Sequence, residues 1–272
     1  HHNLLAHHTN RTPRLCGSRY TGKPEEEKVE LFNNVIYNYG SDGAYAGEGG
    51  EYNFINNYYK PGPFTATKSS YKHLFTAYAD DGKNNNAAGT HGLFYFGGNY
   101  IDPTCDKLTE KQRKDIMVVN KDNAAGLIIK KEFAPVDEVL YNKPFEIAEH
   151  TSLQSTWDAY ESVLNFAGAS YARDAHDKRI KGTYTYEGSH GSTNGMIDRP
   201  ADVGGWGEYK QTAAPVDTDG DGMPDEWEKA HGLNPENGSD GAAYNLSASY
   251  TNLEVYLNGL VAHLYPQEAL KK

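Results

Sequence analysis

Six positions between residues 217 and 228 carry the ligand pattern of a calcium-binding loop. In order, they are Asp217, Asp219, Asp221, Met223, Asp225 and Glu228. Five of these residues supply carboxylates, and Met223 supplies a backbone carbonyl at the seventh position of the pattern. Gly222 stands where the loop needs a sharp turn. Oxygen donors alone suit a hard cation such as Ca²⁺ rather than a softer metal, so the pattern predicts a Ca²⁺ site. A solvated acidic loop is the alternative, which so complete a match disfavours.

The residues that follow the loop predict two short helices that hold it in place. The first begins at Asp225 and ends before Gly232, a residue suited to a helix C-terminus. Thr251 and Glu254 have the spacing of a capping box at the start of the second helix. Its apolar residues form one stripe: Leu253, Tyr256, Leu257 and Leu260. We therefore expect residues 211–272 to form a tail domain in which the cation supports folding, separate from residues 1–210.

Composition limits the class of protein to which the chain can belong. The net charge of −11 argues against a general nucleic-acid binder, and no apolar run reaches the length of about 18 residues that indicates a membrane span. The chain opens at His1 without an initiator Met, which we interpret as a mature or truncated piece. Cys16 and Cys105 leave open both a disulfide and two separate thiols.

Asparagine pairs recur beside short apolar stretches in the first third of the chain. The clearest are Asn33–Asn34 and Asn56–Asn57, with looser copies at His2–Asn3 and Gly98–Asn99. Repeats of this length indicate stacked units that cannot bury their apolar face alone. We expect a mainly β, parallel β-helix in which equivalent asparagines form ladders between coils. A β-sandwich with fortuitous pairs is the alternative.

Later segments add one strand and one helix to this expectation. Leu127–Ile129 is an apolar, strand-like run. From Ser155 onward the apolar residues recur at helical spacing, Ser155 and Asp158 form a capping box, and Gly168 is placed to end the helix. The stripe comprises Trp157, Tyr160, Val163, Leu164 and Ala167. We expect this stripe to face the core.

The segment Asn10-Arg11-Thr12-Pro13, followed by a strand with the pair Asn33–Asn34, resembles the later coils of family 1 polysaccharide lyases, the pectate lyases. Residues 158–180 and the tail 217–260 are similar to the C-terminal region of bacterial secreted members. The resemblance implies a right-handed parallel β-helix with a small helical calcium-loop cap. It also implies a secreted, monomeric enzyme that cleaves an acidic polysaccharide, polygalacturonate or pectin, by Ca²⁺-assisted β-elimination.

By the same resemblance, Arg11 is the base that removes the C5 proton, and Arg14 and Arg19 bind substrate carboxylates. An arginine is normally protonated, so we expect this role to need neighbouring cations and alkaline pH. Cys16 stands where the family usually has a second arginine, which weakens the match at the substrate-contact positions. The family's aspartates that hold the catalytic calcium precede the arginine segment, so we expect this chain alone to be weakly active or inactive. The alternative for Arg11 is a surface arginine beside a turn proline.

Two other classes of protein compete with the lyase. A non-catalytic secreted β-helix could bind acidic glycan without cleaving it, and substitution of Arg11 would separate the two by turnover. An esterase or hydrolase on the same fold needs carboxylates as nucleophile or acid and base. The sequence has no paired-carboxylate motif in a comparable coil, which disfavours this third reading.

Overall fold

The computed structural model describes residues 1–130, 136–150, 152–183 and 194–264. The chain divides into two compact units. Unit 1 comprises residues 1–168 and 174–206, and unit 2 comprises residues 169–173 and 207–272. The expected division into residues 1–210 and 211–272 stays a prediction, and each unit is considered by itself below.

Unit 1 contains all the strands that the structure describes, and most of them are short. The strands are β1 Leu4–Ala6, β2 Arg14–Leu15, β3 Lys28–Phe32, β4 Val35–Tyr37, β5 Tyr45–Ala46, β6 Gly50–Ile55, β7 Tyr58–Lys60, β8 Phe75–Ala77, β9 Gly92–Gly97, β10 Tyr100–Ile101 and β11 Leu127–Ile129. The α-helices of both units are α1 Glu110–Lys121, α2 Val136–Val139, α3 Thr156–Phe166, α4 Ala175–Thr183, α5 Asp225–His231 and α6 Asn252–Val261.

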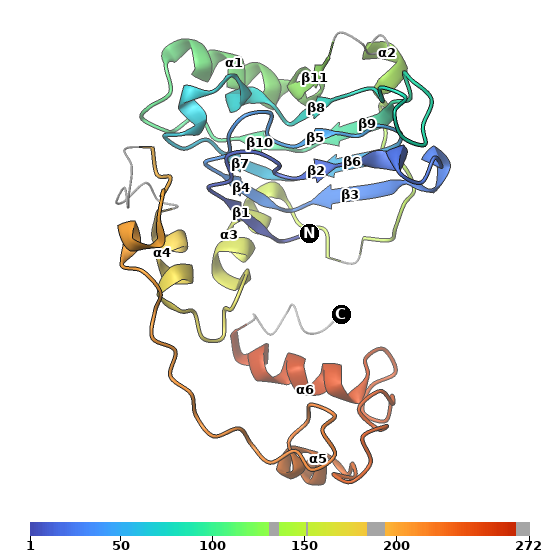
Figure 1. Cartoon of the computed structure of the whole chain (residues 1–272), viewed down its shortest axis with the longest axis vertical. Helices are drawn as coiled ribbons and strands as arrows, with labels where there is room; N and C mark the ends of the chain where they lie inside the picture. The colour runs from blue at the N-terminus through green and yellow to red at the C-terminus, as the bar shows by residue number, and fades with distance from the viewer. Residues whose placement is uncertain (131–135, 151, 184–193, 265–272) are drawn as a thin grey trace. The chain divides into compact units, whose positions relative to one another are not determined.

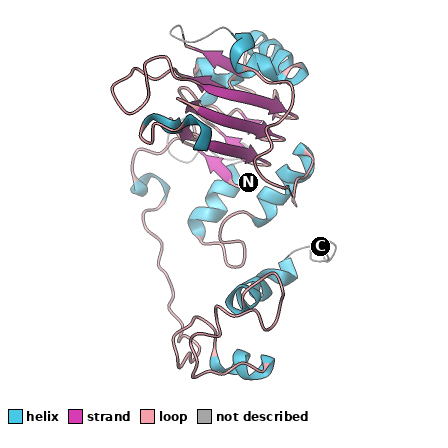
Figure 2. Ribbon diagram, turned by 90° about the vertical axis from the view of Figure 1, so that its right-hand side faces the viewer, coloured by secondary structure: helices cyan, strands magenta, loops and turns pink. Residues whose placement is uncertain are grey.

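The strands form three parallel sheets that the chain visits in turn (Figures 1 and 2). Sheet A has the order β1-β4-β7-β10, sheet B the order β11-β8-β5-β2, and sheet C the order β3-β6-β9. Every strand pair within these sheets is parallel. Each circuit of the chain thus adds one strand to each sheet, an arrangement compatible with the predicted parallel β-helix.

The asparagine pairs lie at the corner between sheet C and sheet A, and they explain why the chain turns there. The first member of each pair has a positive φ, which asparagine and glycine adopt more readily than other residues: 53° at Asn33, 50° at Asn56 and 68° at Gly98. The second members form a ladder, because Asn34 Nδ2 donates to Asn57 Oδ1 at 3.0 Å and Asn57 Nδ2 donates to Asn99 Oδ1 at 2.9 Å. The expected ladder between successive circuits is therefore confirmed.

Aromatic rings fill the interior between the sheets. Side chains alternate along a strand, so β6 sends Tyr52 and Phe54 inward while Asn53 faces outward. Tyr52 stacks on Phe94 with ring centroids 5.2 Å apart, and Phe54 stacks on Phe96 at 5.0 Å. Parallel in-register pairing brings equivalent residues of neighbouring strands together, which is why rings of one kind stack along the unit.

Two segments cover the outer faces of sheets A and C. Helix α3 packs Val163 against Val35 and Tyr58 on sheet A. Its predicted cap is confirmed, since the backbone N–H of Asp158 donates to Ser155 Oγ at 3.2 Å. Within its predicted stripe Val163 is buried and Tyr160, Leu164 and Ala167 are partly buried, whereas Trp157 is 55% exposed.

The segment 141–150, called the strap below, crosses the outer face of sheet C. Phe145 exchanges two backbone hydrogen bonds with the side chain of Asn53, at 2.9 and 3.0 Å. His150 Nε2 lies 2.6 Å from Glu30 Oε2, and both side chains are largely buried. These contacts fix the strap across β3 and β6. Sheet B, by contrast, presents a row of partly exposed polar residues.

Helix α1 packs beside β10 and buries Ile116 and Val119 in the interior cluster that also contains Ile101. It begins with a capping box between Thr109 and Gln112.

Unit 2 contains the acidic loop and the two helices expected around it. Helix α5 ends at the left-handed Gly232, and α6 begins at the capping box of Thr251 and Glu254, so both predictions are confirmed. The apolar stripe of α6 is less buried than expected within the part of the chain that the structure describes, since Leu257 is 50% exposed.

Two further expectations can be compared with the structure. Cys16 and Cys105 are separate thiols, and Cys105 is buried. Among the described residues, no helix is long and apolar enough to cross a membrane.

Candidate functional site

Arg11 lies beside sheet B in an uncommon backbone conformation. Its φ is +61°, a left-handed value that few residues other than glycine, asparagine and aspartate adopt. The side chain of Asn10 accepts a hydrogen bond from the Arg11 backbone N–H at 2.8 Å, and this contact stabilises the turn. The guanidinium is exposed, and its Nε donates to the Tyr45 hydroxyl at 3.3 Å. The chain thus presents an oriented, solvent-accessible arginine at this edge.

Arg14 extends the same face toward the tyrosine of the next strand. The register aligns Arg14 of β2 with Tyr45 of β5. The Arg14 guanidinium carbon lies 5.7 Å from the centroid of the Tyr45 ring, a cation–π contact. Arg14 Nε is buried and has no hydrogen-bond partner in the described part of the chain. Arg11 and Arg14 therefore approach one tyrosine from neighbouring positions.

Tyr78 and Lys130 continue this row across β8 and β11. The rings of Tyr45 and Tyr78 lie 5.6 Å apart, and Lys130 Nζ lies 5.2 Å from the Tyr78 ring centroid. Asp42 anchors both residues, accepting a hydrogen bond from the Tyr78 hydroxyl at 3.0 Å and lying 3.7 Å from Lys130 Nζ. Burial and the hydrogen bond to Asp42 raise the pKa of Tyr78 to about 12, so it is a neutral phenol at ordinary pH.

We call the row Arg11, Arg14, Tyr45, Tyr78 and Lys130 the sheet B row. It places two aromatic rings between cations, and its members lie in or next to successive strands of sheet B. Cations can pair with carboxylates, and aromatic rings can pack against the apolar faces of sugar rings. The row is suited to an extended acidic ligand.

Arg19 lies in a different setting from Arg11 and Arg14. Its guanidinium contacts Glu48 at 3.4 Å, Asp81 at 3.6 Å and Asp80 at 4.0 Å. Its side chain is 16% exposed. Three carboxylates of its own chain therefore surround this cation, which favours a structural role. Its expected role in substrate binding stays a prediction.

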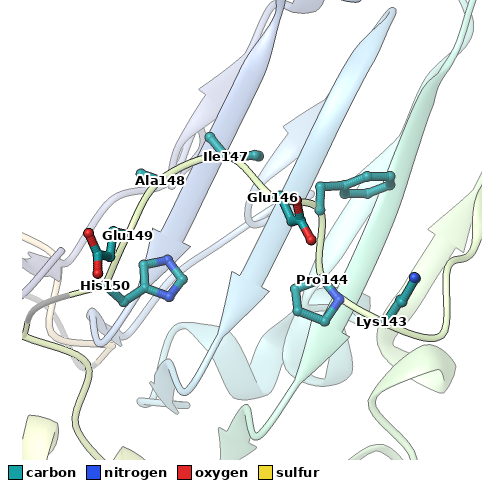
Figure 3. A pocket seen from close by; sticks show the side chains of 8 residues that line it. Lys143, Pro144, Glu146, Ile147, Ala148, Glu149 and His150 are labelled. Carbon is teal, nitrogen blue, oxygen red and sulfur yellow. The ribbon is translucent and has the colours of Figure 1, made fainter.

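The pocket in Figure 3 lies along the strap on sheet C and contains none of the predicted site residues. It is lined by residues 143–150 of the strap. Glu146 and Glu149 add negative charge to it, and Ile147 and Pro144 add apolar surface. Lys143 is the lysine of this lining, whereas the sheet B row presents three cations, so the sheet B row is the better candidate for an acidic polymer.

In unit 2, the structure brings together four of the five carboxylates named in the predicted pattern and adds Asp240. Ligand atoms of Asp217, Asp219 and Asp221 lie within 4.8 Å of one another. The same holds for Asp221, Glu228 and Asp240. Burial, together with the carboxylates of the neighbouring aspartates, raises the pKa of Glu228 to about 7. Such mutual repulsion is relieved when a divalent cation sits among the oxygens.

Two of the expected ligands, Asp225 and Met223, do not belong to either carboxylate group. Asp225 turns its carboxylate toward Thr218, accepting hydrogen bonds from the backbone N–H and the hydroxyl, both at 2.8 Å. Met223 is fully buried, and the role of its carbonyl stays a prediction. The loop residues as a set fit a cation with oxygen ligands, since all the gathered groups are carboxylates.

Sequence reasoning did not find Tyr45, Tyr78, Lys130 or Asp240. Tyr45 lies in the two-residue strand β5, and Tyr78 directly follows the three-residue strand β8. Neither strand is long enough to show an alternating pattern, and the parallel pairing of β5 with β8 brings the two tyrosines together. Asp240 lies 12 residues beyond Glu228 in a turn-rich segment, so no local spacing connects it with the loop. Only the three-dimensional arrangement brings these groups to the sites.

Unit 1 is a parallel-stranded β protein, and its sheet B row is suited to an acidic ligand. Comparison with known proteins shows which proteins the chain is similar to. The chain is 32% identical over 250 residues to probable pectate lyase C of Aspergillus flavus, covering 90% of this chain and 52% of that protein. It is 33% identical over 250 residues to probable pectate lyase C of Aspergillus fumigatus, with 90% and 51% coverage.

Probable pectate lyase C of Emericella nidulans gives a similar result, with 30% identity over 247 residues and coverage of 90% and 51%. These similarities support the pectate lyase family predicted from the sequence. These relatives are fungal, and the bacterial type expected from the tail stays a prediction. The chain spans about half the length of the curated relatives that it matches. No family model and no solved structure matches the chain.

Proposed function

We propose that the chain is part of a pectate lyase that cleaves polygalacturonate by β-elimination. The observation that carries this proposal is the similarity to curated pectate lyases over 90% of the chain. The position of Arg11 agrees with it, because this arginine is exposed next to Arg14 and Tyr45 and forms no ion pair with the described residues. The finer fold assignment within this proposal is a right-handed parallel β-helix with a small helical cap.

The reaction requires one proton transfer and one bond cleavage. Arg11, acting in its neutral form, takes the proton from C5 of a galacturonate unit. The electron pair forms the C4–C5 double bond while the C4–O bond breaks, and the leaving oxygen takes up a proton from water. Because the neutral form of an arginine is rare, we expect turnover to increase at alkaline pH.

The other residues of the sheet B row bind and orient the polymer. In this proposal Arg14 pairs with a uronate carboxylate, and Tyr45 holds the Arg11 side chain through its hydroxyl. Tyr78 and Lys130 offer a ring and a cation to a neighbouring sugar unit. A Ca²⁺ ion, when bound with the substrate, would withdraw charge from the uronate carboxylate and make the C5 proton more acidic.

We also propose the setting in which this reaction takes place. The cofactor is Ca²⁺, the partner is an acidic polysaccharide, and the protein acts outside the cell as a monomer. The names of the relatives support the substrate class, and the acidic loop of unit 2 supports the use of Ca²⁺. The role of that loop in this proposal is structural.

Substitution of Arg11 tests the proposed reaction. The chain is incubated with polygalacturonate and Ca²⁺ at alkaline pH, and the ultraviolet absorbance of the unsaturated product is followed. Arg11→Ala should lower kcat by about 100-fold or more, because the base is lost, while changing the Kd for oligogalacturonate only a few-fold. Arg199→Ala is the matched control, since the Arg199 side chain is 78% exposed and its ion pair among the described residues is with nearby Asp202.

Four outcomes distinguish the candidate functions. Turnover that depends on Arg11 supports the lyase, and turnover that survives Arg11→Ala contradicts the assignment of the base. We expect turnover by this chain to be weak, so binding of oligogalacturonate with no detectable turnover even at high protein concentration favours the non-catalytic glycan-binding module. A chain that neither binds nor cleaves the polymer contradicts both.

A further inference from the structure

Glu228 is a buried carboxylate without a partner of its own. It is fully buried, and neither of its oxygens has a hydrogen-bond partner in the described part of the chain. No ion pair of the described residues involves it. An unpaired buried carboxylate is costly, so native proteins pair such groups or use them to coordinate a metal.

Three further carboxylates direct an unpartnered oxygen into the same cluster. Asp219 Oδ2, Asp221 Oδ2 and Asp240 Oδ1 are all buried without a hydrogen-bond partner among the described residues. The second oxygen of each carboxylate accepts a hydrogen bond from a backbone N–H. Asp219 accepts from Asp221 at 3.3 Å, Asp221 accepts from Met223 at 2.8 Å, and Asp240 accepts from Asn234 at 3.0 Å. The backbone thus anchors each carboxylate by one oxygen and leaves the other available.

Asp240 differs from the other ligand candidates because it comes from outside the loop. It lies beyond α5, in the turn that leads to α6. Its ligand atom lies within 4.8 Å of those of Asp221 and Glu228. Asp225, the ligand expected from the loop pattern, is instead engaged by Thr218 and lies 3.8 Å from Lys229 Nζ.

The turn that carries Asp240 is attached to the start of α6. The buried Asn252 donates from Nδ2 to the Asp240 carbonyl at 2.8 Å, and the backbone N–H of Leu253 donates to the Gly241 carbonyl at 3.1 Å. A methyl group at Gly241 would lie only 2.6 Å from Asp221 Oδ2, so this turn approaches the loop closely and a larger residue there would displace the Asp221 carboxylate.

We propose that Asp240 completes a single Ca²⁺ site with Asp217, Asp219, Asp221 and Glu228, and that the ion ties the acidic loop to the turn that holds α6. Five carboxylates provide the hard oxygen donors and the negative charge that Ca²⁺ prefers. The ion therefore links two segments of unit 2 that are separate in sequence. This inference does not depend on the lyase reaction, because its readouts are metal affinity and stability.

The experiment compares Asp240→Asn with Asp225→Asn in the full chain. After treatment with a chelator, Ca²⁺ binding is measured by isothermal titration calorimetry. Asp240→Asn should weaken Ca²⁺ binding by about 10- to 100-fold, as expected for a lost ligand, and Asp225→Asn should change it much less. The wild-type chain should bind a single ion at the site. The reverse order of the two variants, or equal losses, would overturn the assignment.

Thermal unfolding with and without Ca²⁺ separates a ligand from a merely structural residue. Without Ca²⁺, Asp240→Asn and Glu228→Gln should be at least as stable as the wild type, because each removes repulsion within the cluster. With Ca²⁺, both should gain much less in Tm than the wild type. An Asp240→Asn variant that is destabilised equally in both conditions would contradict the proposal, and Glu228→Gln keeps the test decisive if Asp240→Asn folds poorly.

Discussion

At the scale of single residues, the arginine segment combines an uncommon backbone with an exposed cation. Residues other than glycine rarely adopt positive φ, and such conformations occur often at functional sites because the surrounding structure must maintain them. Arg11 has such a φ, and Asn10 and Tyr45 hold its backbone and its side chain. This observation favours Arg11 over a surface arginine of ordinary geometry.

Buried histidines give unit 1 a defined response to acid. Burial lowers the pKa of His73 to about 4. The Asp42 carboxylate opposes this shift, and the cations of Lys72 and Lys130 add to it. The unfolded chain therefore binds a proton between pH 6.5 and pH 4 that the folded chain does not. This contribution to stability is complete above pH 6.5 and decreases as the pH falls toward 4, by at most about 3 kcal/mol.

We expect His73→Gln to reduce this loss of stability on acidification. Urea unfolding of the variant and the wild type at a series of pH values between 4 and 7 measures it. His7 serves as an internal comparison, because burial also lowers its pKa to about 4 and its contribution should remain in the variant. An unchanged pH dependence in His73→Gln would show that this histidine is not responsible.

The sequence indicates some site residues but not others, and the reason is the range of the contacts involved. The acidic residues between 217 and 228 are adjacent in the chain, so their spacing reveals a shared role. Arg11 is indicated by a local motif and a family resemblance. Tyr78, Lys130 and Asp240 join their sites through strand pairing and a distant turn, and no local pattern records such contacts.

At the scale of elements, the asparagine ladder fixes the corner between sheet C and sheet A. Asn57 is fully buried, and its side chain makes hydrogen bonds to both neighbouring ladder members. It also accepts from the backbone N–H of Asn34 and donates to the Leu31 carbonyl. Such a fully satisfied network stabilises the fold, and an incomplete one is costly.

Asn57→Leu should destabilise unit 1 by roughly 3–5 kcal/mol, because it leaves several buried polar groups without partners. Urea unfolding followed by circular dichroism measures the change. Asn123→Ala is the comparison, since Asn123 ends the described ladder and is only partly buried, and we expect a smaller loss there. Equal losses at the two positions would contradict this account of the ladder.

Helices and turns were predicted correctly where the sequence carries a strong local pattern, and a helix was missed where that pattern is weak. The asparagine pairs, the capping box at Ser155 and the glycine after α5 each have a local physical cause, and the structure places them as expected. Helix α1 was not predicted, although Thr109 and Gln112 form a capping box at its start. Its only buried residues are Ile116 and Val119, too few for a clear helical period.

At the scale of the whole molecule, the two units should respond differently to calcium. The acidic cluster lies entirely in unit 2, whereas the parallel sheets lie in unit 1. A ligand that binds only the folded state raises stability by about 2.7 kcal/mol at 100 times its Kd. We therefore expect a chelator to lower the unfolding temperature of unit 2 and to leave that of unit 1 nearly unchanged.

Differential scanning calorimetry with Ca²⁺ and with a chelator measures this difference. Limited proteolysis provides a second measure, since the cleavage sites that appear when the chelator is added should fall between residues 207 and 264. An equal shift of both transitions would contradict the assignment of the Ca²⁺ effect to unit 2.

The ladder of asparagines also has a consequence for how such a chain can change over evolutionary time. Successive ladder members are separated by 31, 23, 42 and 24 residues, yet each meets its neighbour through the same side-chain contact. Residues inserted between two rungs therefore extend outward as loops and leave the pairing of the strands unchanged. Natural mutation or protein engineering can therefore lengthen the loops around the sheet B row and alter which polymer this row binds. The asparagine ladder at the corners keeps the strand pairing unchanged.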